Sequence, residues 1–224
     1  MSQLVDIFLQ PSKVFAAERE RPTFLLPALV LAALAVAFTL AYFFRVDPGW
    51  YADHMFDASG GNMSAKQMAQ AKANMPSPKV MGVFGAVGGV LTVALMLAIS
   101  ALYYWIVSKI TGRGLGYRHG LSLSAWSAMP AVLGSIIALV GALTMNPQTG
   151  IESLMLTHVD PLLVQLPADA RWNRLAQSAD LLSIWTVFLS ALGWRIFARS
   201  SWAQALVVAL LPLVVVYGVV ALIP

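Results

Sequence analysis

The chain has 224 residues, of which 59% are hydrophobic and only 11% charged, and it contains no cysteine. A soluble domain carries about a quarter charged residues, so this composition indicates that lipid solvates most of the chain. The lack of cysteine excludes disulfides, thiolate zinc sites and cysteine nucleophiles, and a net charge of +4 without a dense basic patch argues against nucleic-acid binding.

The segment before the first long apolar stretch is predicted to form short amphipathic helices rather than a random tail. Apolar residues recur there at helical spacing around Pro11, namely Leu4, Ile7, Phe8, Val14 and Phe15. Helices of this kind lie in the membrane interface with their apolar face in the lipid. We therefore expect short interfacial helices on the cytoplasmic surface.

Five apolar stretches are predicted to cross the membrane as helices: residues 25–44, 80–107, 121–145, 181–197 and 203–223. A bilayer core of about 30 Å needs roughly 20 helical residues, and lipid requires each segment to satisfy its own backbone hydrogen bonds. The first stretch is longer than the apolar part of a secretory signal and has no cleavage site after it, so we expect a retained anchor. The predicted fold class is all-α: a polytopic membrane protein with a five-helix bundle, forming a single domain over residues 1–224.

Two long loops separate the spans, residues 45–79 and 146–180. In the first loop, Ser64 and Gln67 match a capping box that starts a helix, and Pro76 ends this helix. In the second loop, the apolar residues of "IESLMLTHVDPLLVQLP" predict a helix that lies on the membrane surface. We expect both loops to belong to the membrane domain.

The lysines and arginines favour one orientation. With five spans, the side that holds the N-terminus carries eight of them and the opposite side carries six. The two short turns on the first side contain lysine or arginine and no acid. The positive-inside rule therefore predicts a protein of the inner (cell) membrane whose N-terminus is cytoplasmic and whose C-terminus is outside.

Charged residues inside the membrane, which often mark transport or proton relays, are nearly absent. The middle of the first, second, third and fifth spans contains no Asp, Glu, Lys, Arg or His. His119, at the mouth of the third span, is interpreted as an interfacial residue rather than a general base. We expect no catalytic residue, no cofactor and no metal, and hence no enzymatic activity.

Small residues recur along one face of several spans. The second span contains Gly85 and Gly89 in a GxxxG pair, the third has Ser124, Ser127 and following small residues, and the fourth has Ser183, Thr186, Ser190 and Gly193. Such stripes allow helices to approach closely, so we interpret them as packing surfaces. The alternative is a small-solute transporter or channel with a path between helices two to four.

A copper site is the least favoured interpretation, together with a membrane enzyme. His54 lies in the first outer loop with four methionines, Met55, Met63, Met68 and Met75. Thioether ligands suit Cu(I), but these spacings are irregular and equally fit an amphipathic face.

Two segments carry a family resemblance. In "IFLQPSKVFAAERERPTFLLPAL", an element with Phe8, Pro11 and Phe15 precedes Arg21, Pro22 and Pro27. In "TGRGLGYRHGLSLSAWSAMPAVL", a glycine-rich basic turn precedes a helix of small residues with a kink at a proline, marked by Gly112, Gly114, Tyr117, Ala125, Ser127 and Pro130. These patterns resemble the Yip family of Ypt/Rab-interacting membrane proteins, including its bacterial members.

This resemblance implies a membrane protein that acts by binding partners, as in membrane traffic, and it supplies no catalytic residue. The sequence therefore predicts a non-enzymatic protein that works through membrane lipids or an unknown membrane or cytoplasmic protein. A second copy of the chain is a further candidate partner. The residues expected to contact partners or lipids are Arg113, Arg118, His119 and Arg199.

Overall fold

Helices and the turns between them build the described part of the chain. The computed structural model describes residues 3–58, 64–166 and 172–222. In chain order the helices are α1 (Gln3–Leu9), α2 (Pro11–Glu20), α3 (Leu25–Phe43), α4 (Pro48–Ala58), α5 (Ala65–Ala73), α6 (Pro78–Ile110), α7 (Tyr117–Ser127), α8 (Ala131–Thr144), the 3₁₀ helix η1 (Ile151–Leu154), α9 (Val159–Leu162), α10 (Asn173–Ser178), α11 (Leu182–Ala198) and α12 (Trp202–Leu222).

Three helices are long and apolar enough to cross a membrane: α3, α6 and α12. The helices α7 and α8, of 11 and 14 residues, are each too short to cross a membrane alone and make a fourth span only as a pair. They meet at a bend of 46°. The apolar helix α11 has 17 residues and is shorter than the other candidates. The all-helical, multi-pass class is thus confirmed, whereas the expected count of five membrane helices becomes three or four by length and composition.

The third predicted span, residues 121–145, is broken near Pro130, where the sequence predicts a kink. The helix α7 ends at Ser127 and α8 begins at Ala131, with Pro130 in the break. Because proline has no backbone N–H, the helical hydrogen-bond ladder cannot pass through it unbroken. The carbonyl of Trp126, four residues before the proline, accepts the N–H of Met129 at 3.3 Å instead.

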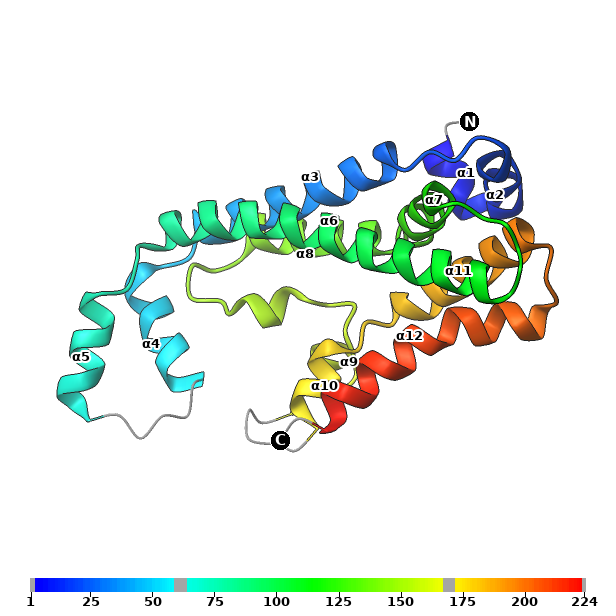
Figure 1. The fold of residues 1–224 in the computed structure, drawn as a ribbon. Helices are drawn as coiled ribbons and strands as arrows, with labels where there is room; N and C mark the ends of the chain where they lie inside the picture. The colour runs from blue at the N-terminus through cyan, green and yellow to red at the C-terminus, as the bar shows by residue number, and fades with distance from the viewer. Residues whose placement is uncertain (1–2, 59–63, 167–171, 223–224) are drawn as a thin grey trace.

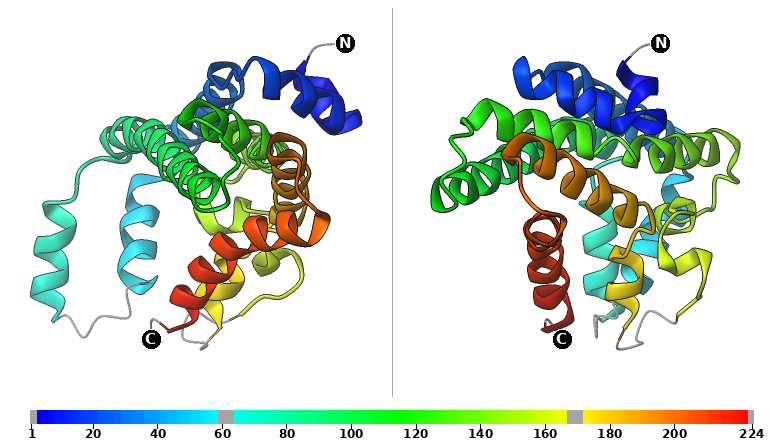
Figure 2. Two further views of the ribbon diagram at one scale, coloured as in Figure 1. Left: turned by 45° about the vertical axis from the view of Figure 1, so that its right-hand side comes forward. Right: turned by 90° about the vertical axis from the view of Figure 1, so that its right-hand side faces the viewer.

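The loops and short helices gather at two ends of the molecule (Figure 1). One end holds α1, α2, the turn from α6 to α7 and the turn from α11 to α12. The opposite end holds α4 and α5, and α9 and α10 also lie away from α1 and α2 (Figures 1 and 2). The end of α12 lies beside α10, where the Tyr217 hydroxyl donates to the Ser178 carbonyl at 3.3 Å. We refer to the two as the α1–α2 end and the loop end.

The helices α3 and α6 pack through glycines. A Cβ atom at Gly82 would lie 2.7 Å from the Phe43 side chain, and one at Gly85 would lie 3.0 Å from Thr39. At Gly89 the nearest neighbour, Ala35, would be 3.8 Å away. The missing side chains therefore let α3 lie close against α6, whose opposite face exposes large apolar residues such as Phe84 and Leu91, as expected of a surface in lipid.

The two outer loops differ in how well the sequence predicted them. The capping box at Ser64 is present: Ser64 Oγ accepts from the N–H of Gln67, whose side chain accepts from the Ser64 N–H. The helix predicted within residues 146–180 is wrong, because Ile151–Leu154 is a 3₁₀ turn and Asp160 has non-helical φ/ψ angles in the four-residue α9. The first loop also meets the second, since the Asp47 N–H donates to the Pro147 carbonyl at 2.9 Å.

Candidate functional site

One face of α7 holds the N-terminal helices in place. His119, Ser122 and Trp126 follow each other at steps of three and four residues, which places them on one side of a helix. Ser122 Oγ donates to the Glu18 carboxylate at 2.8 Å, and Trp126 Nε1 donates to the Thr23 carbonyl at 3.0 Å. The third contact joins His119 Nε2 to the Arg19 carbonyl at 3.3 Å. We call these contacts between α7 and residues 18–23 the N-terminal clamp.

Glu18 is the centre of the clamp. Only 1% of its surface is exposed, although a carboxylate is costly to bury without partners. Its oxygens accept hydrogen bonds from the N–H and hydroxyl of Thr23, from Ser122 and from the side chain of Gln3. These neutral donors replace the water that the carboxylate loses, so the burial of Glu18 fixes the position of α2 on α7.

His119 has a structural role at the same site. Its Nδ1 accepts the Gly116 N–H at 3.3 Å, while Nε2 faces the Arg19 carbonyl, so the proton must be on Nε2. Its ring also packs edge-on against Phe197 of α11. Both ring nitrogens are thus engaged by the backbone, and Ser122 donates to Glu18 rather than to this histidine.

The helix α11 closes the far side of the clamp. Phe15 and Phe197 are both buried and pack edge to face, with ring centroids 6.1 Å apart. A Cβ atom at Gly193 would lie 2.4 Å from the Leu123 side chain and 2.9 Å from Phe15. Three segments, α2, α7 and α11, therefore meet at this glycine.

A cavity of about 360 Å³ lies on the opposite side of α7. Ser124 comes two residues after Ser122, which is roughly 200° around a helix. Six serine and threonine side chains line the cavity, from α6, α7 and α11: Ser100, Ser124, Ser127, Ser183, Thr186 and Ser190. Apolar side chains of α6 and α12 form the other walls. The hydroxyl oxygens of Ser124 and Ser127 are buried and have no hydrogen-bond partner within the described residues.

The structure separates the small-residue stripes of the sequence into two settings. Gly85 and Gly89 face α3. Ser127 faces the cavity together with Ser183, Thr186 and Ser190 of α11, which the sequence had indicated as a packing surface. Helical spacing correctly placed these residues on common faces, but it did not distinguish a filled interface from a cavity.

The remaining residues of the two family segments shape the α1–α2 end. Pro11 starts α2, and Pro27 is buried in the first turn of α3, with Pro22 between them. Gly112 and Gly114 have φ angles of 65° and 71°, which favour glycine, and they turn the chain from α6 into α7. Tyr117, the first residue of α7, donates its hydroxyl to the Ala98 carbonyl at 3.1 Å.

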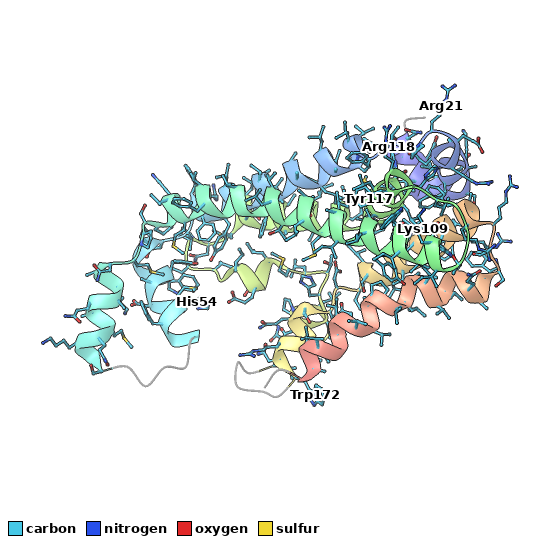
Figure 3. All side chains as sticks on the ribbon, viewed as in Figure 1. Arg21, His54, Lys109, Tyr117, Arg118 and Trp172 are labelled. Carbon is cyan, nitrogen blue, oxygen red and sulfur yellow. The ribbon has the colours of Figure 1, made fainter. Side chains whose placement is uncertain are left out.

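The arginines expected to contact partners lie at the same end. Arg113 donates to the Gln204 side chain at 2.7 Å and so joins the turn after α6 to the start of α12. Arg118 is exposed, and Arg199 is exposed with a φ angle of 49° at the end of α11. Figure 3 places Arg118 and Lys109 near Arg21, and His54 and Trp172 far from them.

The histidine and two of the methionines of the first outer loop have contacts or exposure that the structure describes. His54 stacks on Trp50 and bonds Glu152 at 2.9 Å, while Met75 packs against the Tyr42 cluster and Met55 is exposed. Met63 lies outside the described residues. Within the described chain, no group of three or more His, Cys, Asp or Glu side chains is placed to hold a metal.

The loop end also contains an open, polar pocket of about 590 Å³. Glu152, Asp160, Asn173 and Gln177 are among the residues that line it. Near this pocket, burial and the negative charge of Glu152 raise the pKa of the Tyr51 hydroxyl above its ordinary value.

Sequence reasoning did not identify the clamp residues Glu18, Ser122 and Trp126. A signal was available, because the polar residues 119 and 122 share one helix face with Trp126. Nothing local in the sequence pairs that face with a carboxylate 104 residues away.

Comparison with known proteins places the whole arrangement in a family. The Yip1 domain model matches residues 5–223. The chain is also similar to "Membrane protein YknW" of Bacillus subtilis (strain 168), with 25% identity over 209 residues that cover 91% of this chain and 84% of that protein. No solved structure matches the chain significantly. Since the domain model spans both family segments, the clamp and the cavity, the chain belongs to the Yip1 family.

Proposed function

We propose that this Yip1-family membrane protein works without catalysing a reaction, by binding protein partners or lipids in the organisation of its membrane. The observation that carries the proposal is the N-terminal clamp, which holds α1 and α2 in one position on the bundle. A pair of amphipathic helices fixed in this way is suited to present a binding surface of constant shape.

The proposed binding surface is the exposed side of α1 and α2 together with Arg118 and Arg199. Leu9 is 64% exposed and Val5 is 45% exposed, so this side offers apolar as well as charged groups. Lys13 adds an exposed cation, next to Asp6 at 3.9 Å. Apolar anchors rimmed by arginine and lysine are typical of contacts with proteins and with anionic lipid surfaces.

The same end of the molecule is proposed to face the cytoplasm. Its segments carry the arginines and lysines of the two short turns, so the positive-inside rule gives a cytoplasmic N-terminus. Because α11 brings the chain back to this end before α12 leaves it (Figure 1), the C-terminus is proposed to lie outside. On this orientation the loop end, with α4, α5 and the polar pocket, lies outside the inner membrane.

Site-specific photocrosslinking in native membranes tests the binding surface. A photoreactive amino acid at Leu9 or Arg118 should give discrete adducts, with a protein, a lipid or a second copy of the chain. The matched control is Gln70, an exposed residue of α5 at the loop end. Adducts no more abundant or discrete at Leu9 and Arg118 than at Gln70 would contradict the proposal.

A small-solute transporter is the second candidate function, favoured by the hydroxyl-lined cavity between α6, α7 and α11. Hydroxyl groups can replace part of the water around a polar solute in the membrane. Flux of small solutes into liposomes that contain the purified protein distinguishes the two functions. Robust flux that is lost when a substitution fills the cavity would show that the protein transports solutes and would contradict the proposed binding function.

A further inference from the structure

The cavity is open to the side, between two helices that separate. The helices α6 and α12 meet where the Tyr103 hydroxyl donates to the Val208 carbonyl at 2.7 Å. From there α12 diverges from α6 toward the loop end, as Figure 1 and the left view of Figure 2 show. Met96 and Ile99 of α6 and Val216 of α12 line the cavity and are each more than half exposed. The opening therefore lies on a surface that faces lipid.

The floor of the cavity is polar and incompletely hydrogen-bonded. Ser127 is 1% exposed and Ser124 is 7% exposed, and neither hydroxyl oxygen has a partner within the described residues. An unsatisfied buried hydroxyl is unfavourable, and the bilayer core holds no water to relieve it. The described side chains that line the cavity are uncharged, so the site suits a neutral group that accepts hydrogen bonds.

The volume and walls fit a chain-like ligand. About 360 Å³ falls within the range of about 300–1,000 Å³ that ligand pockets occupy, and it exceeds the roughly 30 Å³ of one water about tenfold. Aliphatic side chains form much of the remaining wall, with Leu97, Leu213 and Val216 among them. A molecule with a hydrocarbon chain and one neutral oxygen acceptor matches both the walls and the floor.

We propose that the cavity binds one acyl chain of a bilayer glycerolipid, which enters from the side between α6 and α12. The ester carbonyl of that chain accepts hydrogen bonds from Ser124 and Ser127, while the charged headgroup stays outside the uncharged cavity. This proposal rests on the proposed function in one respect, that the protein binds lipids, and it names the class of lipid. The cavity is a separate lipid site, away from the α1–α2 surface.

The site is tested with the full-length protein in vesicles of phosphatidylethanolamine and phosphatidylglycerol. A fraction of the lipid carries a photoreactive diazirine in one acyl chain, and mass spectrometry locates the adducts after irradiation. The expected result is a cluster of adducts on the cavity-lining parts of α6, α7 and α12, several-fold above those on the lipid-facing residue Phe84. Adducts spread evenly over α3, α6 and α12, with none on α7, overturn the proposal.

Ser127→Leu fills the floor of the cavity and should remove the adducts on α7. Gly88→Leu is the matched control, because it adds a similar side chain where no atom lies within 4 Å, and it should leave them unchanged. Leu213→Trp narrows the opening from α12 and gives a second test if Ser127→Leu does not fold. If α7 is still labelled in a folded Ser127→Leu or Leu213→Trp protein, the acyl-chain site is overturned.

The hydroxyl contacts are tested by Ser124→Ala together with Ser127→Ala, which keeps the cavity open and removes both donors. Several-fold weaker labelling of α7 is expected, and unchanged labelling overturns the ester contact. Absence of cavity adducts in the unsubstituted protein, with intact crosslinking at Leu9, would refute the lipid site alone. The reverse result would refute the α1–α2 binding surface alone, and solute flux blocked by Ser127→Leu without lipid adducts would overturn the lipid site in favour of transport.

Discussion

The hydroxyl of Tyr103 in α6 donates a hydrogen bond of 2.7 Å to the carbonyl of Val208 in α12. Val208 lies four residues before Pro212, which is inside α12 and has no N–H to donate back to it. The tyrosine therefore satisfies the carbonyl that the proline leaves free, as a backbone group in lipid requires. It also fixes the point from which the two helices separate.

Tyr103→Phe should lower the free energy of unfolding by about 1 kcal/mol, the usual scale of a hydrogen bond between membrane helices. In a Pro212→Ala background the alanine N–H can pair with the Val208 carbonyl, so the same Tyr103→Phe change should cost clearly less. The double-mutant cycle is measured by unfolding four proteins in mixed micelles: the unsubstituted protein, the two single variants and the double variant. Equal costs in both backgrounds would show that the tyrosine does not act through the proline-freed carbonyl.

Glu18→Ala should release the N-terminal helices. The substitution leaves the Thr23 and Ser122 donors without their acceptor, and we expect a loss of about 2–3 kcal/mol, the scale of hydrogen bonds to a charged group. Trypsin should then cleave faster after Lys13 in α2, because the released helix can adopt the extended conformation that the protease binds. The control is Glu20→Ala, two residues along the same helix at an exposed position. Identical cleavage rates of the two variants would argue against the clamp.

The sequence predicted the bounds of most membrane helices well, because many consecutive apolar residues together mark each helix. The predicted second and fifth spans, residues 80–107 and 203–223, became α6 over Pro78–Ile110 and α12 over Trp202–Leu222. The helix expected in residues 146–180 failed because apolar residues in a loop can be buried by distant segments. Leu154, for example, is buried in the cluster around Tyr42 and Tyr51.

The candidate sites were less accessible to sequence reasoning. The bond between Glu18 and Ser122 joins residues 104 positions apart, and neither residue type specifies that pairing. For the cavity, the spacing of Ser183, Thr186 and Ser190 shows that they share a face. Whether a neighbour fills the space before that face depends on the direction of α12, which its apolar sequence does not encode.

Two glycines should respond in opposite ways to the same substitution. A Cβ atom at Gly120 of α7 would lie 2.5 Å from the backbone oxygen of Ala101 in α6, so Gly120→Ala must push the two helices apart. Overpacking of this kind costs about 1–3 kcal/mol. At Gly88 no atom lies within 4 Å, and Gly88→Ala should be neutral or stabilise by up to about 1 kcal/mol through helix propensity. Thermal unfolding in detergent compares them, and similar melting temperatures would refute the close approach of α7 to α6.

The predicted orientation can be tested cleanly because the protein contains no cysteine. Single cysteines at Ser12 in α2 and at Gln70 in α5 introduce one thiol at an exposed position at each end. With a cytoplasmic N-terminus, a maleimide that cannot cross the inner membrane should label the Gln70→Cys protein from outside. The cells used have an intact inner membrane and outer layers that the maleimide can pass. The Ser12→Cys protein should react only after the inner membrane is opened, because the positive-inside rule retains its basic segment in the cytoplasm. The reverse pattern would invert the topology and place the proposed binding surface outside the cell.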